Sequence, residues 1–122
     1  MDKEKMLLLQ QSMVYETGGN AGARDANLLD VMLNEVFQQR GEKHVYLSTL
    51  QKACQLGYYI MSNRLFMSGN KRTGMYVFIT FLEMNGVSVI ASKDEIVNMA
   101  IGISTGKCKY KDFLKWAKRN TE

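Results

Sequence analysis

The sequence predicts an all-α fold, a compact bundle of about six helices around a central buried helix. Three observations support this prediction. The chain of 122 residues contains no proline, apolar residues recur at helical spacing along most of it, and residues 70–85 are apolar on nearly every side. The length favours a single domain, residues 1–122, and suffices to bury a core without disulfides or a metal.

Apolar spacing and local stop signals predict the first two helices. In the first, residues 4–16, the apolar side chains at roughly helical spacing are Met6, Leu9, Met13 and Tyr15. Glycines after Thr17 end this segment. After a glycine- and asparagine-rich loop, Asp25 is a predicted N-cap. The second helix should end near Gly41, and its apolar stripe consists of Leu28, Leu29, Met32, Leu33, Val36 and Phe37.

Two capping boxes mark the starts of the third and fifth helices. Ser48 and Gln51 form the first box and open a helix that runs to about Ser62. Ser92 and Glu95 form the second box and open a helix that runs to about Gly106. The positions that the third helix should bury are Ala53, Leu56, Gly57 and Ile60.

The central helix, residues 70–85, lies between these two in the chain. Its apolar side chains are Met75, Val77, Phe78, Ile79, Phe81, Leu82 and Met84. Residues 87–91 are rich in β-branched side chains, which favours an extended connector. A last helix, residues 109–119, should turn Phe113, Leu114 and Trp116 toward the core.

Composition narrows the classes of function. Cys54 and Cys108 lack the spacing of a zinc site or a disulfide framework, so we expect two reduced thiols and no metal site. No apolar run could span a bilayer and no signal-peptide cleavage site is present, so we expect a cytoplasmic protein without a membrane partner. The net charge of +4 permits an anionic partner. The C-terminal lysines lack interleaved aromatic residues, which favours a solvated helix face over a nucleic-acid surface.

Gly69, Asn70, Lys71 and Arg72 stand directly at the start of the predicted central helix. Gly69 lets a ligand approach the main chain, and the first N–H groups of a helix favour an anion. Lys71 and Arg72 add two positive charges, and an arginine can hold a phosphate through two parallel hydrogen bonds. These residues predict a phosphate or nucleotide site. The alternative is that Ser68 or Asn70 caps the helix while both cations are solvated.

The segment NRLFMSGNKRTG, residues 63–74, resembles the signature of the Fic/Doc family, His-Pro-Phe-x-Asp/Glu-Gly-Asn-Lys-Arg. Further segments resemble the Doc branch in order and extend over nearly the whole chain: TGGNAGARDANLLDVML, GEKHVYLSTLQKACQLGYYIMSN, FLEMNGV and DFLKWAKRN. The resemblance implies a Fic fold, ATP as substrate, and transfer of AMP or of the terminal phosphoryl group to a protein hydroxyl. It also implies an antitoxin partner and a translation factor, elongation factor Tu, as target.

The same resemblance implies roles for single residues. Gly69 and Asn70 would form the anion-binding turn, Lys71 and Arg72 would hold the nucleotide phosphates, and Phe66 would anchor the loop. Three positions depart from the family signature. Arg64 replaces the histidine that accepts the proton of the target hydroxyl, which an arginine cannot do. Leu65 replaces the proline. Ser68 replaces the acid that holds Mg²⁺, so the metal ion loses its usual protein ligand. We therefore expect that the chain binds ATP and that transfer is weak or absent.

Several alternatives stay open at the level of the sequence. The loss of all three signature residues favours natural degeneration over a single inactivating change at Arg64. His44 is a conceivable replacement base, but its place upstream of the third helix favours a structural role. The stretch Ser12 to Glu16 resembles the S-x-x-x-E core of an inhibitory helix, although capping or solvation of a helix end is the simpler interpretation of Glu16. The alternative function is a non-catalytic protein-interaction module, and a basic nucleic-acid-binding protein ranks last.

Overall fold

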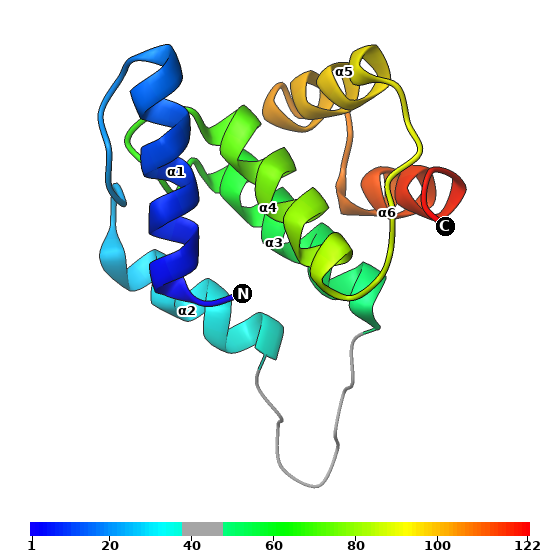
Figure 1. The fold of residues 1–122 in the computed structure, drawn as a ribbon, viewed down its shortest axis with the longest axis horizontal. Coiled ribbons are helices and arrows are strands. Elements are labelled where there is room, and N and C mark those ends of the chain that lie inside the picture. The colour runs from blue at the N-terminus through cyan, green and yellow to red at the C-terminus, as the bar shows by residue number, and fades with distance from the viewer. Residues whose placement is uncertain (38–47) are drawn as a thin grey trace, which may run out of the picture.

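The computed structural model describes residues 1–37 and 48–122, and this part of the chain contains six helices. They are α1 (Lys3–Thr17), α2 (Ala26–Phe37), α3 (Thr49–Asn63), α4 (Asn70–Met84), α5 (Lys93–Ser104) and α6 (Tyr110–Arg119). Figure 1 shows α3 and α4 running through the middle, with α1 and α2 on one side and α5 and α6 on the other. The predicted all-α fold class is therefore confirmed.

The close contact of α3 with α4 depends on two glycines. A Cβ atom built on Gly74 would lie 2.4 Å from Cγ of Met61, and one built on Gly57 would lie 3.0 Å from the carbonyl oxygen of Gly74. Neither position has room for a larger side chain without movement of its neighbours, so the two backbones approach closely.

The central helix is buried on most sides, but not on all. Its buried residues are Thr73, Gly74, Met75, Val77, Phe78, Phe81 and Leu82. The expectation of burial on nearly every side is wrong for Met84, which is 52% exposed in the last turn of the helix, before the exposed Asn85-Gly86 turn. Tyr76 is also half exposed, because the face of α4 between α1 and α5 stays open.

Local capping signals predicted the helix starts well. The hydroxyl oxygen of Ser48 accepts a hydrogen bond from the Gln51 amide at 3.1 Å, and that of Ser92 accepts one from the Glu95 amide at 3.2 Å. Both capping boxes are complete. Asp25 accepts a hydrogen bond from the Asn27 amide at 2.9 Å, as expected of an N-cap.

The predicted apolar stripes are wider than the buried faces. Tyr15 is 91% exposed, because it lies nine positions after buried Met6 and so on the opposite side of α1. In α2 the buried residues are Leu29, Met32 and Val36, while Leu28 and Phe37 at the margins are exposed. The predicted helix end near Gly41 lies outside the described residues. In α3 all four predicted positions are buried, and in α6 Phe113 and Trp116 are buried while Leu114 is half-buried.

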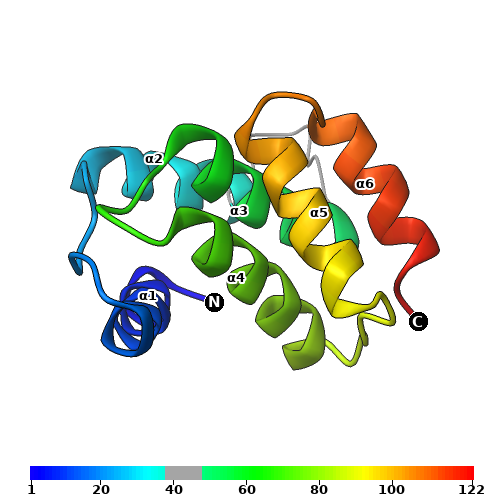
Figure 2. The same ribbon diagram turned by 90° about the horizontal axis from the view of Figure 1, so that it is seen from above.

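The connector after α4 is extended, as predicted, and it pairs with the last residues of the chain. The amide of Ser88 donates to the Glu122 carbonyl at 2.8 Å, and the amide of Glu122 donates back at 2.9 Å. The amide of Ile90 donates to the Asn120 carbonyl at 2.7 Å. Seen from above, α5 lies between α4 and α6 (Figure 2).

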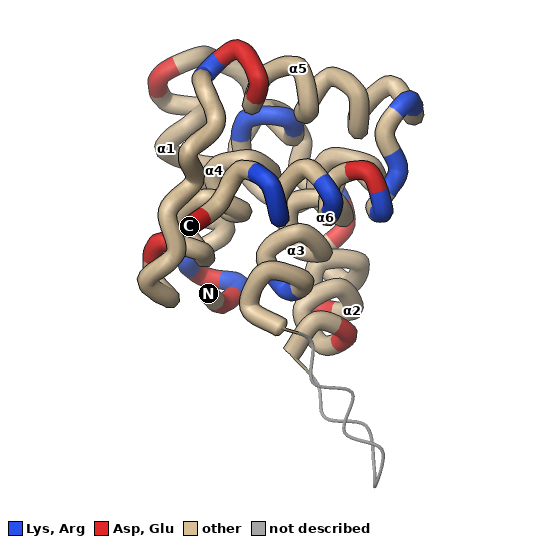
Figure 3. Tube along the Cα trace, turned by 90° about the vertical axis from the view of Figure 1, so that its right-hand side faces the viewer, with Lys and Arg blue, Asp and Glu red and all other residues tan. Residues whose placement is uncertain are grey.

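Basic residues gather on α6 and on the loop before it (Figure 3). The side chains of Lys111, Lys115, Lys118 and Arg119 are exposed, so this face of α6 is solvated as expected. Within residues 1–37 and 48–122, no helix has both the length and the apolar character that a membrane span requires.

Candidate functional site

The loop between α3 and α4 begins at Arg64, which has a left-handed backbone with φ 48° and ψ 61°. Its amide donates to the Ile60 carbonyl and closes the end of α3. A positive φ is uncommon for a residue with a side chain and is held here by the surrounding structure. Leu65 and Phe66 follow and are both buried, so Phe66 lies where an anchor of the loop would. Arg64 itself is exposed.

The side chain of Asn70 braces this loop and does not cap α4. Its Oδ1 accepts a hydrogen bond from the Phe66 amide at 2.9 Å, and its Nδ2 donates to the Phe66 carbonyl at 3.0 Å. The N-cap residue of α4 is Gly69, with φ 70°, and no side chain caps the helix. The alternative in which Ser68 or Asn70 caps α4 is therefore wrong. The helix presents an uncapped N-terminus, which favours an anion.

This N-terminus forms part of a cavity of about 590 Å³, hereafter the polar cavity. Its wall combines the end of α1, the α3–α4 loop, the start of α4 and the end of α5. The lining residues are Thr17, Gly18, Met61, Arg64, Met67, Gly69, Asn70, Lys71, Arg72, Ser104 and Thr105. Three of them are cations and, among the described residues, no aspartate or glutamate lines it. The electrostatic character of the polar cavity is therefore that of an anion site.

Ser68 belongs to the same loop but lies apart from the lining of the polar cavity. Its hydroxyl oxygen accepts a hydrogen bond from the Asn20 amide at 3.0 Å. A Cβ atom built on Gly19 would lie only 2.8 Å from that of Ser68, so the serine packs against the glycine-rich loop after α1. Ser68 thus serves a contact between two loops.

Gln10 holds these two loops together, and the sequence did not reveal it. Its side chain is fully buried in α1, and its Nε2 donates to the carbonyls of Asn20 and Ser68, each at 3.1 Å. Its Oε1 accepts from the Gly22 amide at 2.9 Å. Main-chain bonds from Arg24 to Leu65 and from Met67 to Gly22 continue the contact. A signal was present, since Gln10 lies one turn after Met6 on the buried face of α1.

Two buried hydroxyls near the polar cavity have no hydrogen-bond partner in the described part of the chain. The Oγ of Ser104 has less than 1 Å² of exposed surface and belongs to a residue that lines the polar cavity. The Oγ1 of Thr73 is equally buried and lies 3.8 Å from the Cβ position of Gly69. Buried hydroxyls in proteins normally have hydrogen-bond partners. Each of these two hydroxyls still has a proton to donate. Neither position carries a signal in the sequence.

A second depression, hereafter the apolar groove, adjoins the polar cavity and shares Lys71 and Arg72 with it. It has a volume of about 550 Å³ and lies between α1, α4 and α5. Its other lining residues are Met13, Met75, Tyr76, Ile79, Lys93, Ile96, Val97, Ala100 and Ile101. Its wall is therefore largely apolar, with Lys71 and Arg72 at the end that meets the polar cavity.

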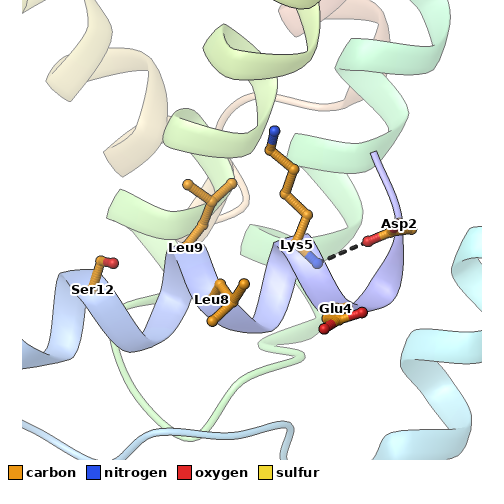
Figure 4. Close-up of a pocket in the computed structure, with 6 residues that line it drawn as sticks. All are labelled: Asp2, Glu4, Lys5, Leu8, Leu9 and Ser12. Atoms are coloured by element: carbon orange, nitrogen blue, oxygen red, sulfur yellow. Dashed lines mark hydrogen bonds between the residues drawn. The ribbon is translucent and has the colours of Figure 1, made fainter.

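Other features of the described residues offer less chemistry. Figure 4 shows a depression along α1 whose carboxylate at Asp2 is already used, since it accepts from the Lys5 amide at 2.8 Å. Glu16 lines a separate depression on α1 and not the polar cavity.

Burial raises the pKa of the Cys54 thiol to about 12, which keeps it protonated at neutral pH, and both cysteines are free. His44 lies outside the described residues. Within them, no group of three or more His, Cys, Asp or Glu could hold a metal ion.

Comparison with known proteins adds one finding. Residues 1–82 match the model of the Fic/DOC family, a match that covers more than half of the chain and includes α1 to most of α4. Members of that family transfer AMP or a phosphoryl group from ATP, often with Mg²⁺, and are usually paired with an antitoxin. None of the curated proteins matches the chain. The match ends before α5, so the cavity wall at Ser104 and Thr105 lies outside it.

Proposed function

This chain belongs to the Fic/DOC family, and we propose that it is a Doc-type member that binds ATP with its phosphates in the polar cavity. The observation that carries the proposal is the uncapped N-terminus of α4, which opens on the same cavity as Arg64, Lys71 and Arg72. Gly69 leaves the main chain accessible there, and the helix dipole favours negative charge at this end. The site takes the polyphosphate of a nucleotide as ligand.

Lys71 and Arg72 would neutralise the phosphates and, in a transfer reaction, stabilise the charge that develops on the transferred group. Arg72 is suited to two parallel hydrogen bonds to one phosphate. Asn70 contributes through the loop that it braces, because its side-chain atoms are engaged with Phe66 at 2.9 and 3.0 Å. The three residues thus combine charge with a fixed backbone.

We infer that transfer to a protein hydroxyl is weak or absent. Arg64 stands at the position of the family histidine and stays protonated, so it cannot accept the proton that the hydroxyl must lose. Among the described residues, no His, Asp or Glu lines the polar cavity to replace it. A target hydroxyl bound there, such as one on elongation factor Tu, therefore finds no general base among the described residues.

The residues present do not fit the Mg²⁺ ion that the family often uses. Magnesium favours carboxylate and phosphate oxygens. Ser68, which stands at the position of the family acid, offers only a hydroxyl, and this hydroxyl is turned to Asn20 and away from the cavity.

The apolar groove favours a second function, that of a protein-interaction module. Tyr76, Val97 and Ile101 are each half exposed along it, which is a surface suited to an apolar segment of another protein. An antitoxin bound in this groove would lie beside Lys71 and Arg72 and would block the phosphate site. Both functions are consistent with a location in the cytoplasm, where ATP and translation factors are present.

The test is a transfer assay with ATP labelled separately on the γ-phosphate and on adenine, with a cell lysate as the source of target. The chain is compared with Arg64→His, which restores a base at the family position. We expect labelling of a protein only by Arg64→His, and the label retained identifies the transferred group. Ser68→Asp is a poor partner variant, because the larger side chain would press on Gly19.

Binding is measured in parallel on the folded proteins, because transfer also needs the right target. Heat stabilisation by ATP that is absent in Arg72→Gln would support the nucleotide site. If ATP gives no stabilisation and a small protein that binds the apolar groove copurifies, the nucleotide site is overturned. The protein-interaction module then remains.

A further inference from the structure

The oxygen atoms around the polar cavity do not form the donor set of a magnesium site. Its side-chain oxygens are the Asn70 amide oxygen, which already accepts from the Phe66 amide, and the hydroxyls of Thr17, Ser104 and Thr105. Two of these hydroxyls already donate to carbonyls of their own helices, Thr17 to Met13 at 2.7 Å and Thr105 to Ile101 at 2.9 Å. A hard divalent cation seeks charged oxygens, and the described lining offers positive charge instead.

Arg64 supplies that positive charge from a fixed backbone. The bond from its amide to Ile60 and the burial of Leu65 hold it on both sides. The guanidinium of Arg24 adds a further brace, since it donates to the Asn63 carbonyl at 3.1 Å. A planar, permanently charged guanidinium at the end of α3 faces the same cavity as Lys71 and Arg72.

The unpartnered hydroxyl of Ser104 lies at the wall of the polar cavity, but less than 1 Å² of its oxygen is exposed, so a bound ligand contacts it only after the side chain rotates. It is a buried donor with no acceptor in the described part of the chain. A phosphate oxygen is an acceptor that would satisfy it, whereas a bound cation would leave its proton unpaired.

We propose that the polar cavity binds the polyphosphate of a nucleotide without a divalent metal ion, with Arg64 compensating the charge that Mg²⁺ neutralises in metal-bound ATP. This inference rests on the proposed nucleotide site and concerns how that site neutralises its ligand. Metal-free ATP carries more negative charge than its magnesium complex. The three cations therefore bind the metal-free form more tightly.

The experiment is calorimetric titration with ATP, once in EDTA and once in excess MgCl₂, at matched ionic strength because surface charge is screened by salt. The native chain should bind ATP several-fold more tightly in EDTA than in MgCl₂. Inorganic tripolyphosphate should bind in EDTA as well, and adenosine should bind at least tenfold more weakly than ATP.

Two variants at Arg64 and one matched control test the role of the guanidinium. Arg64→Gln should lose at least tenfold in affinity for ATP in EDTA and less in MgCl₂. Arg64→Gly should lose as much while relieving the left-handed backbone, so that a folded variant is available even if glutamine is not tolerated there. Arg119→Gln removes the same charge from an exposed position of α6 and should bind as the native chain does.

The outcomes separate this inference from the function on which it rests. Binding of ATP only in MgCl₂ would overturn metal-free binding and leave the nucleotide site standing. Unchanged affinity in both Arg64 variants would overturn the role of Arg64. No binding under either condition would overturn the nucleotide site itself, and the inference with it.

Discussion

The polar cavity and the apolar groove meet at the start of α4 and share Lys71 and Arg72, yet the rest of their walls differs. The polar cavity adds Arg64, an uncapped helix N-terminus and a free hydroxyl. The apolar groove adds mostly aliphatic and aromatic surface from α1, α4 and α5. A shared pair of cations therefore does not define a ligand. The remaining wall decides between a phosphate chain and an apolar segment.

The largest effect should come from Gln10→Ala. Gln10 does not line the polar cavity, but its side chain holds the loops beside it. Three hydrogen bonds to Asn20, Ser68 and Gly22 are lost. We expect a loss of about 3 kcal/mol in the free energy of unfolding, since each hydrogen bond contributes about 1 kcal/mol. Chemical denaturation measures it.

Gln11→Ala is the matched control, because the neighbouring glutamine is exposed on the same helix. It should change the stability by less than about 0.5 kcal/mol. Equal losses in the two variants would mean that the contacts of Gln10 do not hold the loops.

Next in size is Arg72→Gln, which removes one of the two shared cations. The affinity for ATP should fall roughly 10- to 100-fold, as expected for loss of hydrogen bonds to a charged group worth about 1.5–3 kcal/mol. Calorimetric titration measures it, with Arg119→Gln as the charge-matched control. Affinity equal to that of the native chain would exclude Arg72 from the phosphate site.

Ser104→Ala removes a single donor from the wall of the polar cavity. Loss of one donor to a phosphate should weaken ATP binding about fivefold, or roughly 1 kcal/mol. Thr105→Val is its neighbour and control, because the Thr105 hydroxyl already donates to the Ile101 carbonyl at 2.9 Å. The two variants should differ in ATP titration, and identical affinities would remove Ser104 from the ligand contacts.

The smallest effect on nucleotide binding should come from Val97→Ser in the apolar groove. ATP affinity should change by less than about twofold, since substitutions away from a site usually matter little. Fluorescence of anilinonaphthalene sulfonate, an apolar anion suited to this groove, should fall in the same variant. A marked loss of ATP affinity would show that the two depressions act as one site.

Local signals made much of the fold predictable from the sequence. The capping boxes at Ser48 and Ser92 and the N-cap at Asp25 act within a few residues, so their geometry followed directly. Exposure was harder to predict, because it depends on which side of a helix its neighbours cover. Tyr15 is apolar in character yet lies opposite the buried face of α1.

The candidate site was predictable where its residues are contiguous. Gly69, Lys71 and Arg72 do lie together at the polar cavity, as the loop predicted. Gln10 and Ser104 come from distant segments, and only the packing of α1 and α5 brings them to the loop. The orientation of Ser68 toward Asn20 likewise depends on a tertiary contact that no local pattern specifies.

The glycine contact between α3 and α4 has a consequence for the kinetics of binding. Gly57 and Gly74 bring the backbones of α3 and α4 together, so the main-chain positions that carry Arg64, Lys71 and Arg72 are set before a ligand arrives. Association should then need no slow opening step, and electrostatic attraction should set its rate. Observed rates should rise linearly with ATP concentration, without a plateau from a gating step, and fall as ionic strength increases.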